Sequence, residues 1–256
     1  MQSELYDKSA ASAIIVGAGK GLRMNSSTPK QFLELKNRPV IAYALEAFGA
    51  CGKIDDIYFV VSKGEVEFCR ETLLPSLELA KPIQLVEGGL RRQDSVYNGL
   101  LAMEGYEGIV VIHDGVRPFV KTSQIAACIT QAETSGACML GMPVGDTLKR
   151  VGPSQMIEET IPRANMWQAQ TPQAFQYTLI RSAHDRAARE GFAGTDDASL
   201  VERYGGEVKV IKGSVGNIKI TLPEDLVMAE ALLLSKGRPP RRTVCQRTED
   251  SKARQG

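Results

Sequence analysis

The sequence predicts an α/β protein with a Rossmann-like, doubly wound and mostly parallel sheet. Three observations predict this fold. Short apolar runs rich in β-branched residues alternate with segments of helical periodicity along most of the chain. These runs are continuous rather than alternating, which is typical of strands that helices bury on both faces. The chain has 256 residues, 43% of them hydrophobic, which is enough for one large domain with a sizeable core.

The first half of the chain contains strand and helix patterns in strict alternation. Ala13–Val16 is a continuous apolar run that ends at a glycine-rich loop. In the next helical segment Val40, Ala44, Ala47 and Phe48 share one face. By the same criteria strands are expected at 13–16, 57–61, 83–86 and 109–112, and helices at 40–48, 65–74 (ended by Pro75), 93–103 and 124–134.

The alternation stops between Met139 and about Gln170, where no helical pattern is found. Two β-like pieces, 147–151 and 156–161, flank a turn at 152–154 and predict a protruding hairpin arm at about 144–166. Such an insert is too small for a core of its own, so we expect it to pack on a second subunit and form a homodimer.

Helical and strand patterns resume after the arm. Pro223 suits the first turn of a helix, and the acidic residues Glu224 and Asp225 complement its dipole. We expect one domain at 10–236 and a disordered tail at 237–256, which is polar and rich in proline and arginine. The remaining elements are expected as helices at 179–189, 197–204 and 223–234 and strands at 208–211 and 218–221.

Composition narrows the class of protein. The formal net charge of +1 gives no argument for nucleic-acid binding, and we expect none. Five scattered cysteines without a C-x-x-C pair make a disulfide framework or a structural zinc site unexpected and favour a reducing, cytoplasmic location. No apolar run approaches the roughly 20 residues that span a bilayer, and residues 1–9 lack the apolar core of a secretory signal. We therefore expect no membrane association.

The glycine-rich loop at 17–21 matches neither familiar phosphate loop. It lacks the Ser or Thr and the spacing of Walker A, and Leu22 stands where a dinucleotide-binding loop has its third glycine. What remains is a loop that lets the backbone approach a ligand, followed by two cations, Arg23 and Lys30. This arrangement suits a triphosphate whose leaving pyrophosphate needs charge neutralisation. A plain glycine turn with two solvated cations is the alternative.

Two further segments follow predicted strands. Gly88 and Gly89 lead into a helix in which Ser95 can be an N-terminal hydrogen-bonding residue or a ligand contact. Asp114 lies at the carboxyl end of a strand, where ligands of such sheets bind, so we predict a functional role. His113 beside it is expected to be a buried, hydrogen-bonded histidine, and His184 is expected at the surface.

With these segments in place the chain resembles the 2-C-methyl-D-erythritol 4-phosphate cytidylyltransferases of the non-mevalonate isoprenoid pathway, within the nucleotidyltransferase superfamily. The opening, Gly17 to Gln31, matches at superfamily level only. The resemblance extends from about Ala13 to Leu234 and becomes specific through the order of the later motifs, which are Gly88-Gly89-x-x-Arg92-x-x-Ser95, His113-Asp114-x-x-Arg117-Pro118, Asp146-Thr147-x-Lys149, Pro162-Arg163, Trp167-x-x-Gln170-Thr171-Pro172-Gln173, Thr195-Asp196-Asp197-Ala198 and Asn217-Ile218-Lys219.

The resemblance implies a nucleotide-diphospho-sugar transferase type of fold and the coupling of CTP to a sugar-alcohol phosphate with release of pyrophosphate. It implies that Arg23, Lys30, Arg163 and Lys219 are catalytic, with Arg23 and Lys30 on the triphosphate. It also implies that the arm residues Thr147 and Arg163 serve the neighbouring subunit's site. The substrate-binding residues that it implies are Gly17, Ala18, Gly19, Gly89 and Ser95 for the nucleotide and Asp114, Arg117, Thr147, Thr171 and Thr195 for the ribose and sugar phosphate.

The chemistry fits these residue types. A phosphate monoester is already an anionic nucleophile at pH 7, so the reaction needs alignment and charge neutralisation rather than a general base. A Mg²⁺ ion bound mainly through the CTP phosphates would complete the set of cations. Many relatives have Ala where Gly17 stands, a change that should preserve the backbone contacts. Relatives can also carry Asp where Gly216 stands, so the protein ligands of the metal stay unassigned.

Three rival functions remain open at this point. A ribitol 5-phosphate cytidylyltransferase would show the same loop, cations and arm. A non-catalytic nucleotide-binding module is disfavoured by the presence of Arg23, Lys30, Asp114 and Lys219 together. A dinucleotide-dependent oxidoreductase is disfavoured by Leu22 and by the loop-like sequence that follows it.

Overall fold

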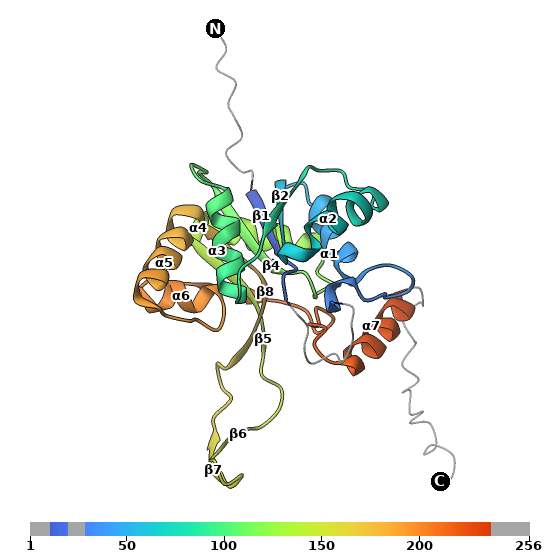
Figure 1. Ribbon diagram of the computed structural model, residues 1–256. Coiled ribbons are helices and arrows are strands. Elements are labelled where there is room, and N and C mark those ends of the chain that lie inside the picture. Colours follow the sequence, from blue (N-terminus) through green and yellow to red (C-terminus); the bar gives the residue numbers. More distant parts are fainter. Residues whose placement is uncertain (1–10, 20–28, 237–256) are drawn as a thin grey trace, which may run out of the picture.

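The structure, a computed structural model, describes residues 11–19 and 29–236. A seven-stranded sheet with the order β3-β2-β1-β4-β8-β5-β9 forms its centre, and the β6–β7 hairpin is separate from it (Figure 1). The strands are β1 (Ala11–Val16), β2 (Ile54–Val61), β3 (Ile83–Glu87), β4 (Ile109–Asp114), β5 (Ala137–Pro143), β6 (Leu148–Val151), β7 (Ile157–Ile161), β8 (Trp167–Gln176) and β9 (Lys209–Lys212).

The sheet is parallel except for one strand. β1 pairs in parallel with both β2 and β4, β2 pairs in parallel with β3, and β5 pairs in parallel with β9. β8 lies antiparallel between β4 and β5. The chain runs outward from β1 through β2 to β3 and then returns to β4 on the other side of β1. The carboxyl ends of β1 and β4 therefore form the topological switch point, where ligands of such sheets bind.

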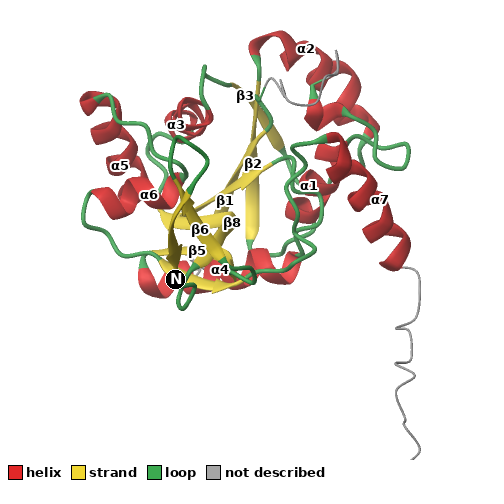
Figure 2. Ribbon diagram, turned by 90° about the horizontal axis from the view of Figure 1, so that it is seen from below, coloured by secondary structure: helices red, strands yellow, loops and turns green. Residues whose placement is uncertain are grey.

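Helices cover both faces of the sheet, as predicted (Figure 2). In β1, Ala13 and Ile15 belong to the core that α1 and α4 cover, whereas Ile14 belongs to the core under α3, α5 and α6. A Cβ on Gly99 of α3 would lie 2.9 Å from an Ile14 methyl group, so this glycine permits close helix–sheet packing. The helices are α1 (Val40–Gly49), α2 (Val66–Phe68), α3 (Arg92–Ala102), α4 (Thr122–Ser135), α5 (Tyr177–Glu190), α6 (Asp197–Arg203) and α7 (Pro223–Lys236).

Several expected elements differ from the structure. The helix predicted at 65–74 is present as a continuous helical segment with an irregular hydrogen-bond pattern: 3-10 at Lys63–Glu65, α2, π at Cys69–Leu73 and 3-10 at Leu74–Ser76. Pro75 lies inside the last 3-10 turn instead of ending the helix. It is tolerated there because the first positions of a helical turn need no backbone N–H donor. The segment 218–221 is not a strand. Its buried residue Ile220 packs under α7, and that burial explains the apolar alternation.

The segment without helical pattern contains more sheet than the sequence indicates. β5 and β8 belong to the central sheet and were not predicted. The arm between them was predicted correctly: β6 and β7 form an antiparallel hairpin that extends away from the body of the molecule (Figure 1). The boundaries of the domain stay a prediction, and the tail at 237–256 lies outside the described residues.

The described cysteines, Cys51, Cys69, Cys128 and Cys138, are all free thiols. Within residues 11–19 and 29–236, every helix is too short or too polar to cross a membrane.

Candidate active site

The predicted site residues of the two glycine loops and of β4 meet at the switch point of the sheet. Val16 pairs with Asp114, the last residues of β1 and β4. Beyond these strands the Gly17 N–H group donates to Val60 O at 2.7 Å, and the Gly115 N–H group donates to Val16 O at 2.9 Å. These bonds extend the sheet by one residue and fix where each loop begins.

The loops after β1 and β3 touch one another. A Cβ on Gly88 would lie 2.4 Å from the Ala18 Cβ atom and 3.0 Å from Ser95 Oγ, so a glycine is required for this contact. The Ser62 hydroxyl donates to Ala18 O at 2.9 Å and holds the first loop from below. The backbone of Ala18 is therefore in a fixed place beside the second glycine loop, as a contact to a planar base would need.

Ser95 organises the second loop. Its hydroxyl oxygen accepts from the Gly89 N–H group at 3.1 Å, and its proton is donated to Arg91 O at 3.0 Å. Of the two roles considered for Ser95, the structure shows the hydrogen bond near the helix start. Arg91 and Asp94 close the same turn, with their ion pair at 2.7 Å. A nucleotide contact by Gly89 or Ser95 stays a prediction.

Gly17 has little free space above it. A Cβ there would lie 2.7 Å from the Phe59 ring, so an alanine at this position would require that ring to move in this chain. At Gly19, the added Cβ would lie 3.8 Å from Lys30 Cε, which places the Lys30 side chain beside the glycine loop. Arg23, the other predicted triphosphate ligand, lies outside the described residues.

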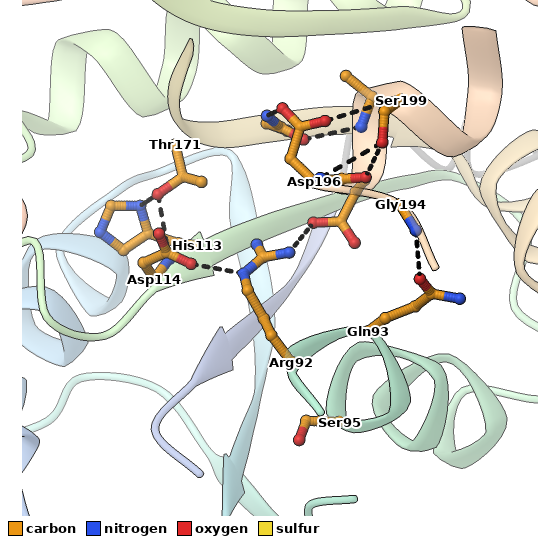
Figure 3. Close-up of polar contacts among 12 residues, drawn as sticks. Arg92, Gln93, Ser95, His113, Asp114, Thr171, Gly194, Asp196 and Ser199 are labelled. Carbon is orange, nitrogen blue, oxygen red and sulfur yellow. Dashed lines mark hydrogen bonds and ion pairs between the residues drawn. The ribbon is translucent and has the colours of Figure 1, made fainter. Parts of the chain in front are cut away.

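Asp114 is the centre of a charged cluster (Figure 3). One carboxylate oxygen lies 2.7 Å from Arg92 Nε, and the other lies 2.8 Å from Lys219 Nζ and 3.7 Å from Arg117 Nε. Only 8% of the Asp114 side chain is exposed, against 37% of Lys219. Burial alone would raise the pKa of Asp114, but Arg92, Lys219 and Arg117 outweigh it and hold the pKa well below its ordinary value. The carboxylate is therefore ionised at neutral pH.

The structure brings the predicted residues Asp114, Arg117 and Lys219 together and adds Arg92, which the sequence reasoning had quoted within a motif but given no role. The second nitrogen of Arg92, Nη1, lies 2.8 Å from Asp197, whose side chain is 1% exposed. Arg117 Nη1 donates to Asn217 O at 2.8 Å. Each arginine therefore has a second partner besides Asp114, which is Asp197 for Arg92 and the Asn217 carbonyl oxygen for Arg117.

Thr171 supports Asp114 from β8. Its hydroxyl oxygen accepts from the Asp114 N–H group at 3.0 Å and lies 3.0 Å from His113 Nδ1. β5 pairs with Gln173 and then with Gln170, so Thr171 is left out of the ladder and turned toward β4. The predicted contact of Thr171 with the sugar phosphate stays a prediction, but its hydroxyl already has two internal partners.

His113 is buried and hydrogen-bonded, as predicted. Burial lowers its pKa to about 4, so the ring is neutral at pH 7. His113 Nε2 lies 3.2 Å from Arg117 O, and a carbonyl oxygen can only accept, so Nε2 carries the proton. Nδ1 must then accept from the Thr171 hydroxyl. His184, expected at the surface, is 1% exposed, and this prediction was wrong: α5 turns the ring inward, where Nε2 lies 3.4 Å from Asp197.

The remaining predicted residues lie away from this cluster or beside it. Thr147 precedes β6 and Arg163 follows β7, so both belong to the arm; Arg163 donates to Gly145 O. Thr195 is exposed in the loop before α6. Two glutamines that were given no role hold this loop: Gln93 accepts from the Gly194 N–H group at 2.9 Å, and Gln173 accepts from the Ala198 N–H group at 3.0 Å (Figure 3 shows the first contact).

Among the described side chains, no group of three or more His, Cys, Asp or Glu is placed to hold a metal ion. Asp114 is already paired with three cations. This part of the chain therefore offers cations for a polyanionic ligand and no ready-made metal cage.

The comparison with known families decides the family of the chain. A model of the family described as 2-C-methyl-D-erythritol 4-phosphate cytidylyltransferase (IspD) matches residues 11–235. The chain belongs to this family. As a member of the family it is a CTP-dependent cytidylyltransferase.

Relatives of this cytidylyltransferase cover almost its whole described length. It is 46% identical over 225 residues to the 2-C-methyl-D-erythritol 4-phosphate cytidylyltransferase of Syntrophotalea carbinolica, which covers 88% of this chain and 96% of that one. The enzyme of the same name from Pelotomaculum thermopropionicum is 44% identical over 224 residues, covering 88% and 94%.

Solved structures agree with the fold. The 4-diphosphocytidyl-2C-methyl-D-erythritol synthase of Anaerococcus prevotii superposes with a TM-score of 0.77 at 31% identity, over 89% of this chain and all of that one. The 2-C-methyl-D-erythritol 4-phosphate cytidylyltransferase of Thermus thermophilus gives a TM-score of 0.70 at 32% identity, over 87% and 98%.

Proposed function

We propose that the chain condenses CTP with 2-C-methyl-D-erythritol 4-phosphate to give 4-diphosphocytidyl-2-C-methylerythritol and pyrophosphate. Membership of the family supports the reaction. The observation that carries the mechanism is the cluster of Lys219, Arg117 and Arg92 around Asp114, next to two glycine loops at the switch point. Cations placed there neutralise the repulsion between two polyanionic substrates.

The proposed step is an in-line displacement at the α-phosphorus of CTP. An oxygen of the methylerythritol phosphate forms the new P–O bond, and the bond from the α-phosphorus to the oxygen that bridges to the β-phosphorus breaks. Pyrophosphate leaves with that electron pair. The nucleophile is ionised at neutral pH because its second pKa is about 6, so no side chain has to remove a proton. Catalysis then consists of alignment and electrostatic stabilisation.

Each predicted residue receives a role in this proposal. The backbone of the loop at 17–19 and of Gly89 lies against the nucleotide, with Ser95 holding Gly89 in place. Lys30, whose side chain lies beside Gly19, binds the triphosphate together with Arg23. Lys219 turns from Asp114 to the phosphate of the second substrate, which its exposure permits. Arg117 and Asp114 are placed near the ribose and that substrate, while Thr171 and Thr195 complete the pocket.

Mg²⁺ belongs to the proposal as an ion that the CTP phosphates hold. This fits the described residues, because they present cations to the phosphates and no cluster of carboxylates to a free ion. Mg²⁺ is commonly bound through substrate phosphates with few protein ligands. When bound, it neutralises part of the triphosphate charge. Its protein ligands stay unassigned.

We further propose that the arm pairs two copies of the chain. A two-stranded hairpin is marginally stable alone in water, and this one exposes Val151, Met156 and Ile157 at 47%, 68% and 62%. If a second copy of the chain covers these side chains, Thr147 and Arg163 of the first copy would lie at the active site of the second copy. A dimer should elute as about twice the 27.8 kDa of one chain, and Ile157→Asp should shift it toward the monomer. A wild-type protein that elutes as a monomer would contradict the pairing.

A cytoplasmic location remains a prediction.

The deciding experiment is pyrophosphate release with CTP and Mg²⁺, comparing 2-C-methyl-D-erythritol 4-phosphate with ribitol 5-phosphate, and ATP, GTP and UTP with CTP. We expect turnover with CTP and methylerythritol phosphate only. Preference for ribitol phosphate would keep the mechanism and change the substrate. No release with either acceptor would favour a nucleotide-binding module and overturn the proposed function.

A further inference from the structure

Asp197 is a buried carboxylate that the proposed mechanism does not use. It is the first residue of α6, and its side chain is 1% exposed. One oxygen lies 2.8 Å from Arg92 Nη1, and the other lies 3.4 Å from His184 Nε2. Burial alone would raise the pKa of Asp197, but Arg92 and His184 lower it overall. The Asp197 carboxylate is therefore a buried negative charge, which needs a neighbouring positive charge such as that of Arg92 to stabilise it.

Arg92 joins this anion to the site. Its Nε atom lies 2.7 Å from Asp114 and its Nη1 atom 2.8 Å from Asp197, so the guanidinium is held at two edges. A guanidinium is planar and presents its donors at fixed angles, so two contacts on different edges determine its orientation. With Asp197 neutral, Arg92 would keep one ionic contact and could rotate about it, because 27% of its side chain faces solvent.

The surroundings of Asp197 are themselves fixed. Gln93, the residue after Arg92, donates to Phe192 O at 3.0 Å and accepts from the Gly194 N–H group. Gln173 of β8 donates to Asp196 at 2.8 Å. Helix α3 and strand β8 therefore hold the segment that leads to Asp197. Helix α3 directly follows the second glycine loop, which contains Gly88 and Gly89 and is called the nucleotide loop below. The exposed Thr195 lies within this segment.

We propose that Asp197 is a positioning residue, which orients Arg92 so that Arg92 in turn aims the Asp114 carboxylate, and which couples the Thr195 loop to the nucleotide loop. Asp197 touches no substrate and acts through Arg92. The inference rests on the proposed function, since it assigns Asp114 a place beside the substrates. The sequence motifs contain both Arg92 and Asp197 but did not indicate their contact, because the two residues are far apart along the chain.

The test compares Asp197→Asn with the matched control Asp196→Asn. Both replace a carboxylate by an amide of the same size at adjacent positions, but Asp196 caps α6 through the Ser199 N–H group at 2.9 Å and does not contact Arg92. We expect Asp197→Asn to lower kcat for cytidylyl transfer about 10- to 100-fold, with less than threefold change in KM for CTP. For Asp196→Asn we expect kcat within about threefold of wild type, because asparagine can still accept from the Ser199 N–H group and cap the helix.

A double-mutant cycle separates positioning from general destabilisation. If Asp197 acts through Arg92, Asp197→Asn should have little further effect on kcat in an Arg92→Lys background. Effects of the two substitutions that multiply, or equal losses in both asparagine variants, would overturn the inference. Absent turnover in the wild type would instead count against the proposed function. In that case a crystal structure of Asp197→Asn is the test, and an unmoved Arg92 would overturn the inference.

Discussion

Thr171→Val tests whether the Thr171 hydroxyl holds the end of β4. Valine has the same shape as threonine but can neither accept from the Asp114 N–H group nor donate to His113 Nδ1. Both groups belong to buried residues: His113 is 0% exposed and Asp114 is 6% exposed. A buried polar group without a partner costs about 1–3 kcal/mol, so two of them should reduce the free energy of unfolding by about 3 kcal/mol or somewhat more.

The assay is urea denaturation of wild type, Thr171→Val and Thr171→Ser at one protein concentration, since association changes apparent stability. Serine keeps the hydroxyl and loses one methyl group, which costs about 1 kcal/mol. In thermal melts the valine variant should lose roughly 6–12 °C, because 1 kcal/mol corresponds to about 2–4 °C for a domain of this size.

A Thr171→Val protein within about 0.5 kcal/mol of wild type would refute the reasoning, because it would mean that the two hydrogen bonds add nothing. A serine variant as unstable as the valine variant would refute it too, since the loss would then come from packing and not from the hydroxyl.

The remaining predictions concern charge, pH and space. The free energy of unfolding should fall by on the order of 3 kcal/mol between pH 6.5 and about pH 4, because His113 stays neutral in the folded protein while the unfolded chain takes up a proton; His113→Gln should flatten this slope in urea titrations. Lys30→Ala should lose about 100-fold in kcat/KM while it still folds, whereas Lys209→Ala at the exposed sheet edge should match wild type; equal activity of both variants would remove Lys30 from the mechanism. Gly88→Ala should raise the Kd for CTP at least tenfold in calorimetry because its Cβ would collide with Ala18, while Gly52→Ala, with open space around it, should bind normally.

The parts of the fold that were predicted from sequence are those whose signal is local. β1, β2 and β4 are continuous apolar runs because helices bury both faces, and that pattern needs no knowledge of neighbours. β8 was missed because its buried side chains include Thr171 and Gln173, whose polarity is satisfied by long-range partners. A single sequence does not distinguish such residues from those of a loop. The false strand at 218–221 has the converse cause, since burial under α7 produced an apolar alternation without a sheet.

The site divides in the same way. The place of Asp114 at the switch point was predictable because the residue ends a buried strand, and its role toward a substrate stays a prediction. Lys219 and Arg117 were proposed only through the resemblance, and their contact with Asp114 depends on how distant segments fold back. Asp197 was part of a quoted motif but received no role, and His184 was expected at the surface, because the contacts of both depend on the packing of α5 and α6 against α3.

The charges around Asp114 also decide which of its partners is able to serve a substrate. Arg92 is held by Asp197, and Arg117 is held by Asn217 O with a side chain that is 11% exposed. Moving either one would leave a buried partner without its cation or donor, which is costly. Lys219 is 37% exposed, and its recorded ion pair within the described residues is with Asp114 alone. If it turns to an incoming phosphate, Asp114 keeps two cations and stays ionised. In the proposed reaction between two anions, the two arginines would therefore act as a fixed frame and Lys219 would be the cation that changes partners.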